Sequence, residues 1–139
     1  MGALLDTDIL SELERDKNEQ VRAHARAYES EHGPLAISAI TIFEVLHGWH
    51  QAHRPDRAEA FLGWLEGADI LSFDAECAKL AGEIGGILTR TGRAIGLADV
   101  AIAATALRHR RVLITGNIQH HERVRAAGFA LDILSWRDP

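Results

Sequence analysis

The chain has 139 residues, of which 47% are hydrophobic and 25% charged, a balance that is typical of globular proteins and argues against disorder. Its net charge is −5, and no apolar stretch reaches the roughly 18–20 residues of a membrane span. The single cysteine, Cys77, excludes an internal disulfide framework. The length fits one domain over residues 1–139. Because the first residues lack the basic and long apolar segments of a signal peptide, we expect this domain to be cytoplasmic.

Apolar runs and helical periodicities alternate along the whole chain. The elements that they predict are a strand at about 2–6, helices at 7–15 and 19–31, a strand at 35–37, a helix from the N-cap Ser38 to Gly48, a helix at 56–66, a strand at 69–72, helices at 74–89 and 97–107, a strand at 112–115, a short helix after 117 and a strand near 130–134. The run from Val112 is continuously apolar, as in buried parallel strands. This alternation predicts an α/β fold with three layers (α/β/α) and a mostly parallel central sheet of four to five strands.

Three acidic residues lie at or inside apolar runs. Asp6 ends the run that begins at Ala3, Glu44 lies inside the run 40–46, and Asp99 lies in the helix predicted at 97–107. A lone desolvated carboxylate is costly and tends to take up a proton, so it is tolerated where a cation lies beside it. Three such carboxylates from distant parts of the chain suggest a shared divalent metal ion.

The predicted topology brings these acids toward one edge of the sheet. Asp6 falls at the carboxyl end of the first strand, and Thr115 and Asn117 follow the fourth. Open parallel sheets bind ligands at that edge. Asp99 would lie in the first turn of its helix, where the helix dipole favours the ionised form. Glu44 would lie about two turns into its helix, within reach of the same crevice.

The charges are unevenly distributed along the chain. Residues 1–69 carry 6 basic and 13 acidic side chains, whereas residues 70–139 carry 9 basic and 7 acidic ones. Of the 15 cationic residues, 13 are arginine, which can bind phosphate in a bidentate fork. This pattern is compatible with a polyanionic substrate, and equally with solvated arginines at the carboxyl ends of helices.

Four blocks of the sequence resemble the motifs of PIN-domain ribonucleases, in family order and with family-like spacing. They are residues 4–10, 37–48, 95–106 and 113–117. The resemblance extends to the VapC-type toxins of bacterial and archaeal toxin–antitoxin pairs. It implies a metal-dependent endoribonuclease that is held inactive by a cognate antitoxin and forms a homodimer, within a larger toxin–antitoxin assembly in some members. Trp49, Phe61 and Trp64 lie on helices that grip partners in this family, although core packing explains them as well.

The resemblance also implies roles for individual residues. The acids that would hold one or two Mg²⁺ ions, with Mn²⁺ as an alternative, are Asp6, Glu44 and Asp99. Such an ion would polarise the scissile phosphate and lower the pKa of an attacking water. Thr7 and Thr115 would orient carboxylates, and Asn117 would position the site. For Thr115 and Asn117, helix capping is an alternative explanation.

One departure from the family pattern concerns the fourth acid. Many members carry it three residues beyond the position of Asn117, often followed by an aromatic residue, whereas this chain has His120 and His121 there. His120 is therefore a candidate metal ligand, and both histidines have exposed surface positions as the alternative. Asp8 is a further candidate ligand, although an acid in the first turn of a helix needs no catalytic explanation.

Two other functions are compatible with parts of the sequence. The sequence Asp6-Thr7-Asp8 also resembles the opening of haloacid-dehalogenase-type phosphatases, but these enzymes need a later lysine and none follows Lys79. The second rival is a catalytically weak PIN-like scaffold that binds RNA or a protein. The missing fourth acid supports this scaffold, and the three intact acids argue against it.

Overall fold

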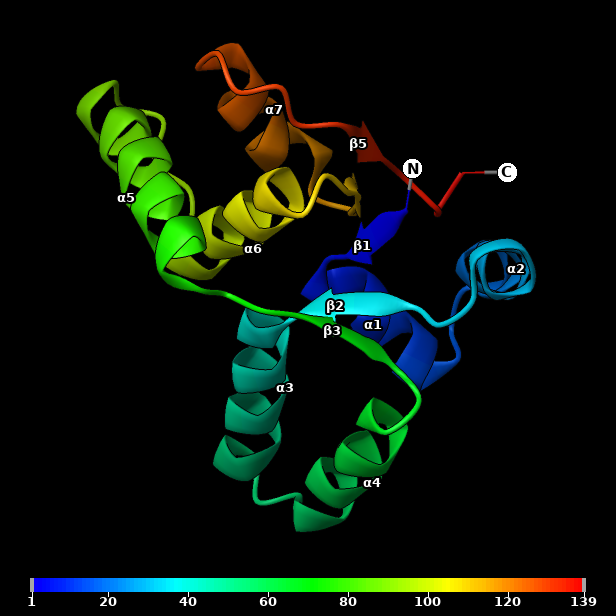
Figure 1. The fold of residues 1–139 in the computed structure, drawn as a ribbon. Coiled ribbons are helices and arrows are strands. Elements are labelled where there is room, and N and C mark those ends of the chain that lie inside the picture. Colours follow the sequence, from blue (N-terminus) through cyan, green and yellow to red (C-terminus); the bar gives the residue numbers. More distant parts are fainter. Residues whose placement is uncertain (1, 139) are drawn as a thin grey trace.

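The computed structural model describes residues 2–138 and contains an α/β fold (Figure 1). The strands are β1 (Ala3–Leu5), β2 (Ala36–Ser38), β3 (Asp69–Leu71), β4 (Val112–Ile114) and β5 (Ile133–Leu134). The helices are α1 (Thr7–Arg15), α2 (Glu19–His32), α3 (Ala39–Gln51), α4 (Pro55–Leu65), α5 (Ala75–Arg90), α6 (Leu97–Arg108) and α7 (Ile118–Ala126). The predicted elements are all present, in the predicted order.

The central sheet has five strands in the order β3-β2-β1-β4-β5, and every neighbouring pair is parallel. The predicted fold class is therefore confirmed, with a sheet that is parallel throughout. β1 lies at the centre, where Leu5 is in register with Ile37 of β2 and with Ile114 of β4. The residues that follow β1 and β4 thus emerge side by side at one edge of the sheet.

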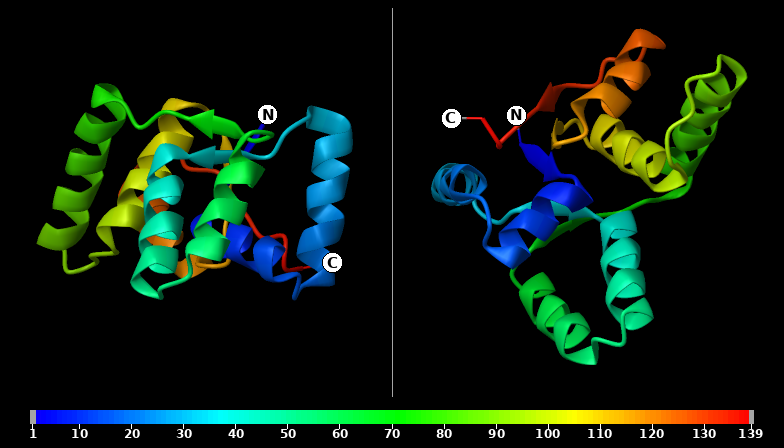
Figure 2. Two further views of the ribbon diagram at one scale, coloured as in Figure 1. Left: turned by 90° about the horizontal axis from the view of Figure 1, so that it is seen from below. Right: turned by 180° about the vertical axis from the view of Figure 1, so that it is seen from behind.

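Side chains that alternate along β1 supply two separate cores. Leu4 packs into a cluster with α5, α6 and α7, whereas Ala3 and Leu5 pack on the other face against α1, α2 and α4. The views from below and from behind show these two groups of helices on opposite sides of the sheet (Figure 2). The three layers follow from this alternation, because each face of the sheet needs its own apolar cover.

Helix α3 packs against both cores. Ile40 packs against the core on the α6 side, while Ile42 and Val45 pack against the core on the α1 side. The Ser38 side chain caps the helix as predicted, because its hydroxyl accepts the N–H of Ile40. This bridging position brings α3 beside both α1 and α6, the helices that follow Asp6 and contain Asp99.

Two boundaries differ from the prediction by more than one residue, and several others shift by one. Helix α3 continues past Gly48 to Gln51, since the N–H of Ala52 still bonds to the carbonyl of Gly48. The last strand is shorter than predicted, because only Ile133 and Leu134 pair with β4. Within residues 2–138, none of the helices combines the length and the apolarity that crossing a lipid bilayer requires.

Candidate metal centre

Asp6 lies at the base of the site, between β1 and α1. Its carboxylate is buried and accepts three hydrogen bonds: from the Thr7 N–H (2.8 Å) to Oδ1, and from the Thr115 hydroxyl (2.7 Å) and His121 Nε2 (3.2 Å) to Oδ2. Burial by itself would raise the pKa of Asp6. The hydrogen bond and charge of His121, together with the Thr115 and Thr7 donors, outweigh burial and lower the pKa below its ordinary 3.8. Asp6 is therefore held ionised.

Thr7 connects Asp6 to Glu44. Its backbone N–H binds Asp6, and its hydroxyl donates to Glu44 Oε1 at 2.6 Å. The Oγ1 of Thr7 also lies 3.1 Å from Oγ1 of Thr41, which is one turn before Glu44 in α3. Because the single proton of the Thr7 hydroxyl is used in the hydrogen bond to Glu44, Thr41 is the donor in this second contact. The predicted orienting role of Thr7 thus has a definite geometry, and the two acids are fixed relative to each other by a single residue.

Asp99 approaches Asp6 from the first turn of α6, as the sequence predicts. One ligand atom from each of Asp6, Asp99 and His121 lies within 4.8 Å of the other two. This set does not include Glu44, whose carboxylate is joined to it through Thr7. Two carboxylates and an imidazole, with a third carboxylate beside them, form a donor set that fits a divalent cation.

The carboxylates of this site repel one another when no cation is bound. Burial raises the pKa of Glu44 above its ordinary 4.5, the Thr7 hydrogen bond lowers it, and the neighbouring carboxylates Asp6 and Asp99 raise it further. The net shift is upward. Like charges gathered in a half-buried site weaken the fold, and they are relieved when positive charge is placed among them.

Thr115 and Asn117 form a relay at the end of β4. The Asn117 N–H donates to Thr115 Oγ1 at 3.0 Å, and the Thr115 hydroxyl in turn donates to Asp6. Thr115 is fully buried, so its hydroxyl is committed to these two partners. Asn117 occupies the N-cap position of α7 without a capping bond from its side chain, which is exposed. The contact that Asn117 makes with the site comes from its backbone N–H and not from its side-chain amide.

Asp8 is not a member of the ligand set. Its Oδ2 accepts the N–H of Gly116 at 2.9 Å and lies 3.6 Å from the Arg137 guanidinium, which also binds Glu12 at 2.8 Å. Burial and the neighbouring Asp6 carboxylate raise the pKa of Asp8 from 3.8 to about 6, despite these donors. Asp8 therefore ties α1 to the loop after β4, and the metal-ligand set described above does not contain it.

The two histidines of α7 occupy different environments. The His120 side chain is 45% exposed, and its Nδ1 lies 3.5 Å from Asp99 Oδ2, which is too long for a good hydrogen bond. His121 is fully buried against Asp6. Sequence reasoning selected His120 as the candidate ligand, and it gave neither His121 nor Thr41 a role in the site.

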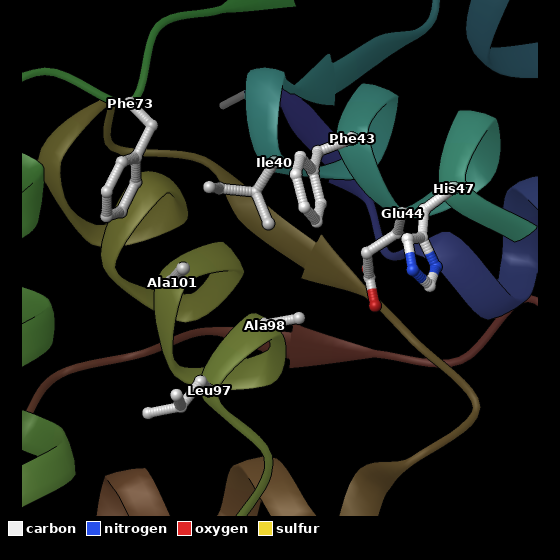
Figure 3. Close-up of a pocket in the computed structure, with 8 residues that line it drawn as sticks. All are labelled: Ile40, Phe43, Glu44, His47, Phe73, Leu97, Ala98 and Ala101. Atoms are coloured by element: carbon white, nitrogen blue, oxygen red, sulfur yellow. The ribbon is translucent and has the colours of Figure 1, made fainter.

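A largely apolar pocket of about 450 Å³ borders Glu44 (Figure 3). It is lined by Ile40, Phe43, Glu44 and His47 of α3, by Leu97, Ala98 and Ala101 of α6, and by Phe73. The Phe43 ring is 70% exposed and stacks on His47 with ring centroids 6.0 Å apart. Glu44 is thus shared between the acidic site and an exposed aromatic surface.

The aromatic residues of α3 and α4 divide between core and surface. Phe61 is buried in the core, so of the two explanations for this residue core packing holds. Trp64 stacks on Phe61 with centroids 6.0 Å apart and is half-buried. Trp49 is also half-buried, with the Arg57 guanidinium 5.5 Å from its ring centroid. The two tryptophans retain surface that a partner can contact.

Comparison with known proteins decides the family. The PIN domain matches residues 3–126, which include Asp6, Glu44, Asp99 and Thr115. The chain belongs to the PIN-domain family. The family resemblance expected from its four sequence blocks is confirmed.

Similar PIN-domain proteins carry the name VapC. The tRNA(fMet)-specific endonuclease VapC of Shigella flexneri is 31% identical over 122 residues, which cover 87% of this chain and 90% of that protein. The DNA-bound VapBC of Salmonella typhimurium contains a chain 27% identical with a TM-score of 0.82, and 98% of each chain is covered. VapBC-1 of nontypeable Haemophilus influenzae contains one 25% identical with a TM-score of 0.81, again covering 98% of each. The chain is a VapC-type PIN-domain protein.

Proposed function

We propose that this chain is the endoribonuclease toxin of a toxin–antitoxin pair and that it hydrolyses RNA phosphodiester bonds with the help of a divalent cation. The observation that carries the proposal is the convergence of Asp6 and Asp99, from opposite parts of the chain, to within 4.8 Å of each other and of His121. Glu44 is tied to this set through Thr7. Solvated surface acids need no such network, whereas a site for a cation does.

The cation best suited to the oxygen donors is Mg²⁺, with Mn²⁺ as the alternative. When bound, it supplies positive charge that polarises the scissile phosphate and lowers the pKa of an attacking water. Asp6 and Asp99 would hold it, and Glu44 would lie on the side of the site that faces the pocket between α3 and α6. Thr115 and Thr7 keep the carboxylates oriented through the hydrogen bonds described above. The Asn117 N–H fixes Thr115 in turn.

The substrate approaches, in this proposal, across the pocket between α3 and α6. Glu44 lines that pocket, and the exposed Phe43 ring offers an aromatic face to an unpaired base. Sequence-specific proteins usually recognise RNA in loops, where unstacked bases are accessible. The Shigella relative is named a tRNA(fMet)-specific endonuclease, so initiator tRNA is the first defined substrate to test.

The partners follow from the same family assignment. The chain pairs with a cognate antitoxin and, we infer, acts in the cytoplasm as a single-domain homodimer within a toxin–antitoxin assembly. An antitoxin arginine that reaches the carboxylates would neutralise the site. Changing Asp6, Glu44 and Asp99 together to amides should then weaken antitoxin binding. Unchanged binding by this triple variant would show that the antitoxin inhibits from elsewhere.

Cleavage of RNA by the purified, antitoxin-free protein tests the function. Total cellular RNA and an initiator tRNA transcript are incubated with Mg²⁺, Mn²⁺ or a chelator, beside the variant Asp99→Asn. We expect discrete fragments that require the metal and disappear in the variant. Absence of cleavage by a folded protein that still binds RNA would favour the catalytically weak PIN-like scaffold instead.

A further inference from the structure

His121 is a fully buried polar side chain beside the site. Its Nε2 lies 3.2 Å from Asp6 Oδ2, and its Nδ1 has no hydrogen-bond partner among residues 2–138. A buried imidazole with one unpaired nitrogen is costly in a position where a phenyl ring would fill the same space. Core packing therefore does not explain why a histidine stands here.

We propose that His121, and not its neighbour His120, supplies a nitrogen ligand to the cation held by Asp6 and Asp99. This inference rests on the proposed function, because it names a ligand of the same centre. The nitrogen concerned is Nε2, which faces the Asp6 carboxylate. The centre would then have a mixed nitrogen and oxygen donor set, in place of an all-carboxylate one.

The distances agree with this role. Metal–ligand bonds of about 2.0–2.2 Å place neighbouring ligands of an octahedral ion about 3 Å apart. Nε2 of His121 and Oδ2 of Asp6 are 3.2 Å apart, and one ligand atom from each of Asp6, Asp99 and His121 lies within 4.8 Å of the other two. The three atoms can thus share one ion with small adjustments.

His120 shares an unpaired Nδ1 with His121, but it has neither the full burial nor the contact with Asp6. It is the residue at the family's fourth-acid position, yet it is absent from the set of ligand atoms that lie within 4.8 Å of one another. Its side chain is half-exposed and its nearest acid is Asp99, at 3.5 Å. Because the two histidines are adjacent and chemically identical, His120 provides a matched control for His121.

A different role for His121 makes different predictions. The ring can instead donate its Nε2–H to Asp6 and only position that carboxylate. Loss of such a donor would weaken Mg²⁺ and Mn²⁺ binding by the same factor. Loss of a nitrogen ligand would weaken Mn²⁺ binding more, because imidazole suits first-row transition ions better than it suits Mg²⁺. The ratio of the two affinities therefore separates the roles.

The experiment compares the unaltered protein with His121→Phe and His120→Phe. MnCl₂ and MgCl₂ are titrated calorimetrically, and electron spin-echo modulation of the Mn²⁺-loaded proteins detects directly bound nitrogen. We expect a nitrogen coupling in the unaltered protein and in His120→Phe, and none in His121→Phe. We also expect His121→Phe to lose about tenfold or more in Mn²⁺ affinity and clearly less in Mg²⁺ affinity.

Two results would overturn the inference. One is an unaltered protein that binds Mn²⁺ without nitrogen coupling, a result that does not depend on whether His121→Phe folds. The other is an equal loss of affinity for both metals, which would leave His121 as a positioning residue. In either case metal-dependent RNA cleavage would still support the nuclease. Nitrogen coupling in a protein that cleaves no RNA would instead uphold the ligand and reject the proposed function.

Discussion

The hydroxyl of Thr115 donates a 2.7 Å hydrogen bond to Oδ2 of Asp6, from a residue 109 positions away in the sequence. Both side chains are buried, and β1 and β4 are adjacent in the sheet, so the pair joins the first acid of the site to the loop after the fourth strand. The Asn117 N–H completes the chain of donors. Several consequences of this arrangement are open to measurement.

Replacing Thr115 with valine should destabilise the protein by about 1–3 kcal/mol, the usual cost of leaving a buried polar group unpaired. Valine has nearly the same shape, so the change removes the donor to Asp6 and the acceptor of the Asn117 N–H without opening a cavity. RNA cleavage should fall as well. Urea unfolding at pH 7 measures the stability. Thr115→Ser keeps the hydroxyl and is the control, and equal stabilities of the two variants would contradict the expectation.

Replacing Glu44 with glutamine should abolish cleavage without weakening the fold. Burial and the Asp6 and Asp99 charges raise the pKa of Glu44, so its ionised form at neutral pH opposes folding. Glutamine removes that charge and can still accept the hydrogen bond from Thr7. Thermal unfolding in chelator should therefore give an equal or higher Tm. A clearly lower Tm would show that the charge of Glu44 is stabilising.

Addition of Mn²⁺ provides a second readout for Glu44→Gln. A ligand that binds only the folded state raises the Tm, and at a fixed concentration the rise is larger for tighter binding. The unaltered protein should gain more on addition of Mn²⁺ than the variant does. An equal gain would remove Glu44 from the cation site, and the loss of cleavage would then need another explanation.

Asp8 should make the stability of the metal-free protein depend on pH. Its pKa is about 6 in the folded state and 3.8 in the reference state. Below about pH 4 the carboxyl is protonated in both states, and between about pH 4 and 6 only the folded state keeps the proton. The stability contributed by this group is therefore lost as the pH rises through about 6, by at most about 3 kcal/mol.

The variant Asp8→Asn tests this pH dependence. It should flatten the curve of unfolding free energy between pH 4 and 6 and gain about 1–2 kcal/mol over the unaltered protein at pH 7. The attraction to Arg137 lowers the pKa of Asp8 and is already included in the limit of about 3 kcal/mol. Urea unfolding in chelator at several pH values gives the curve. Parallel curves for the two proteins would assign the pH dependence to other groups.

Replacing Phe43 with alanine should weaken RNA binding and leave the fold intact. The ring is 70% exposed, so stability should change by less than about 0.5 kcal/mol. Base stacking on an aromatic ring is worth about 1–3 kcal/mol, which corresponds to a fivefold or larger loss of RNA affinity. Leu62→Ala, an exposed change on α4, is the control. A changed mass in light scattering with unchanged RNA affinity would assign Phe43 to contact between two copies.

Much of this fold can be predicted from local patterns. Ser38 and Asp74 cap α3 and α5 with their side chains, as short polar residues before helical runs do. The continuous apolar run from Val112 forms a strand inside the parallel sheet. The positions of Asp6 and Asp99 follow from the same elements, since a carboxylate at the end of a central strand and one in a first helical turn point to the same edge.

What cannot be predicted depends on rotation and tertiary packing. His120 and His121 differ by one residue, which turns a side chain by about 100° around a helix. The angle at which α7 packs on α6 and the sheet decides which ring faces Asp6, and no local pattern encodes that angle. The contribution of Thr41 is hidden for a similar reason, because its hydroxyl gains a role only through Thr7 on another helix. Asp8, conversely, was a candidate ligand that Gly116 engages instead.

The central place of β1 in the sheet has a consequence for how the protein is made. Asp6 is synthesised well before Thr115 and His121, the two residues whose side chains contact its carboxylate. A growing chain that has not yet placed β4 beside β1 therefore has its acids but no assembled site. The site can therefore form only after β4 and α7 have been synthesised and have packed beside β1 and Asp6.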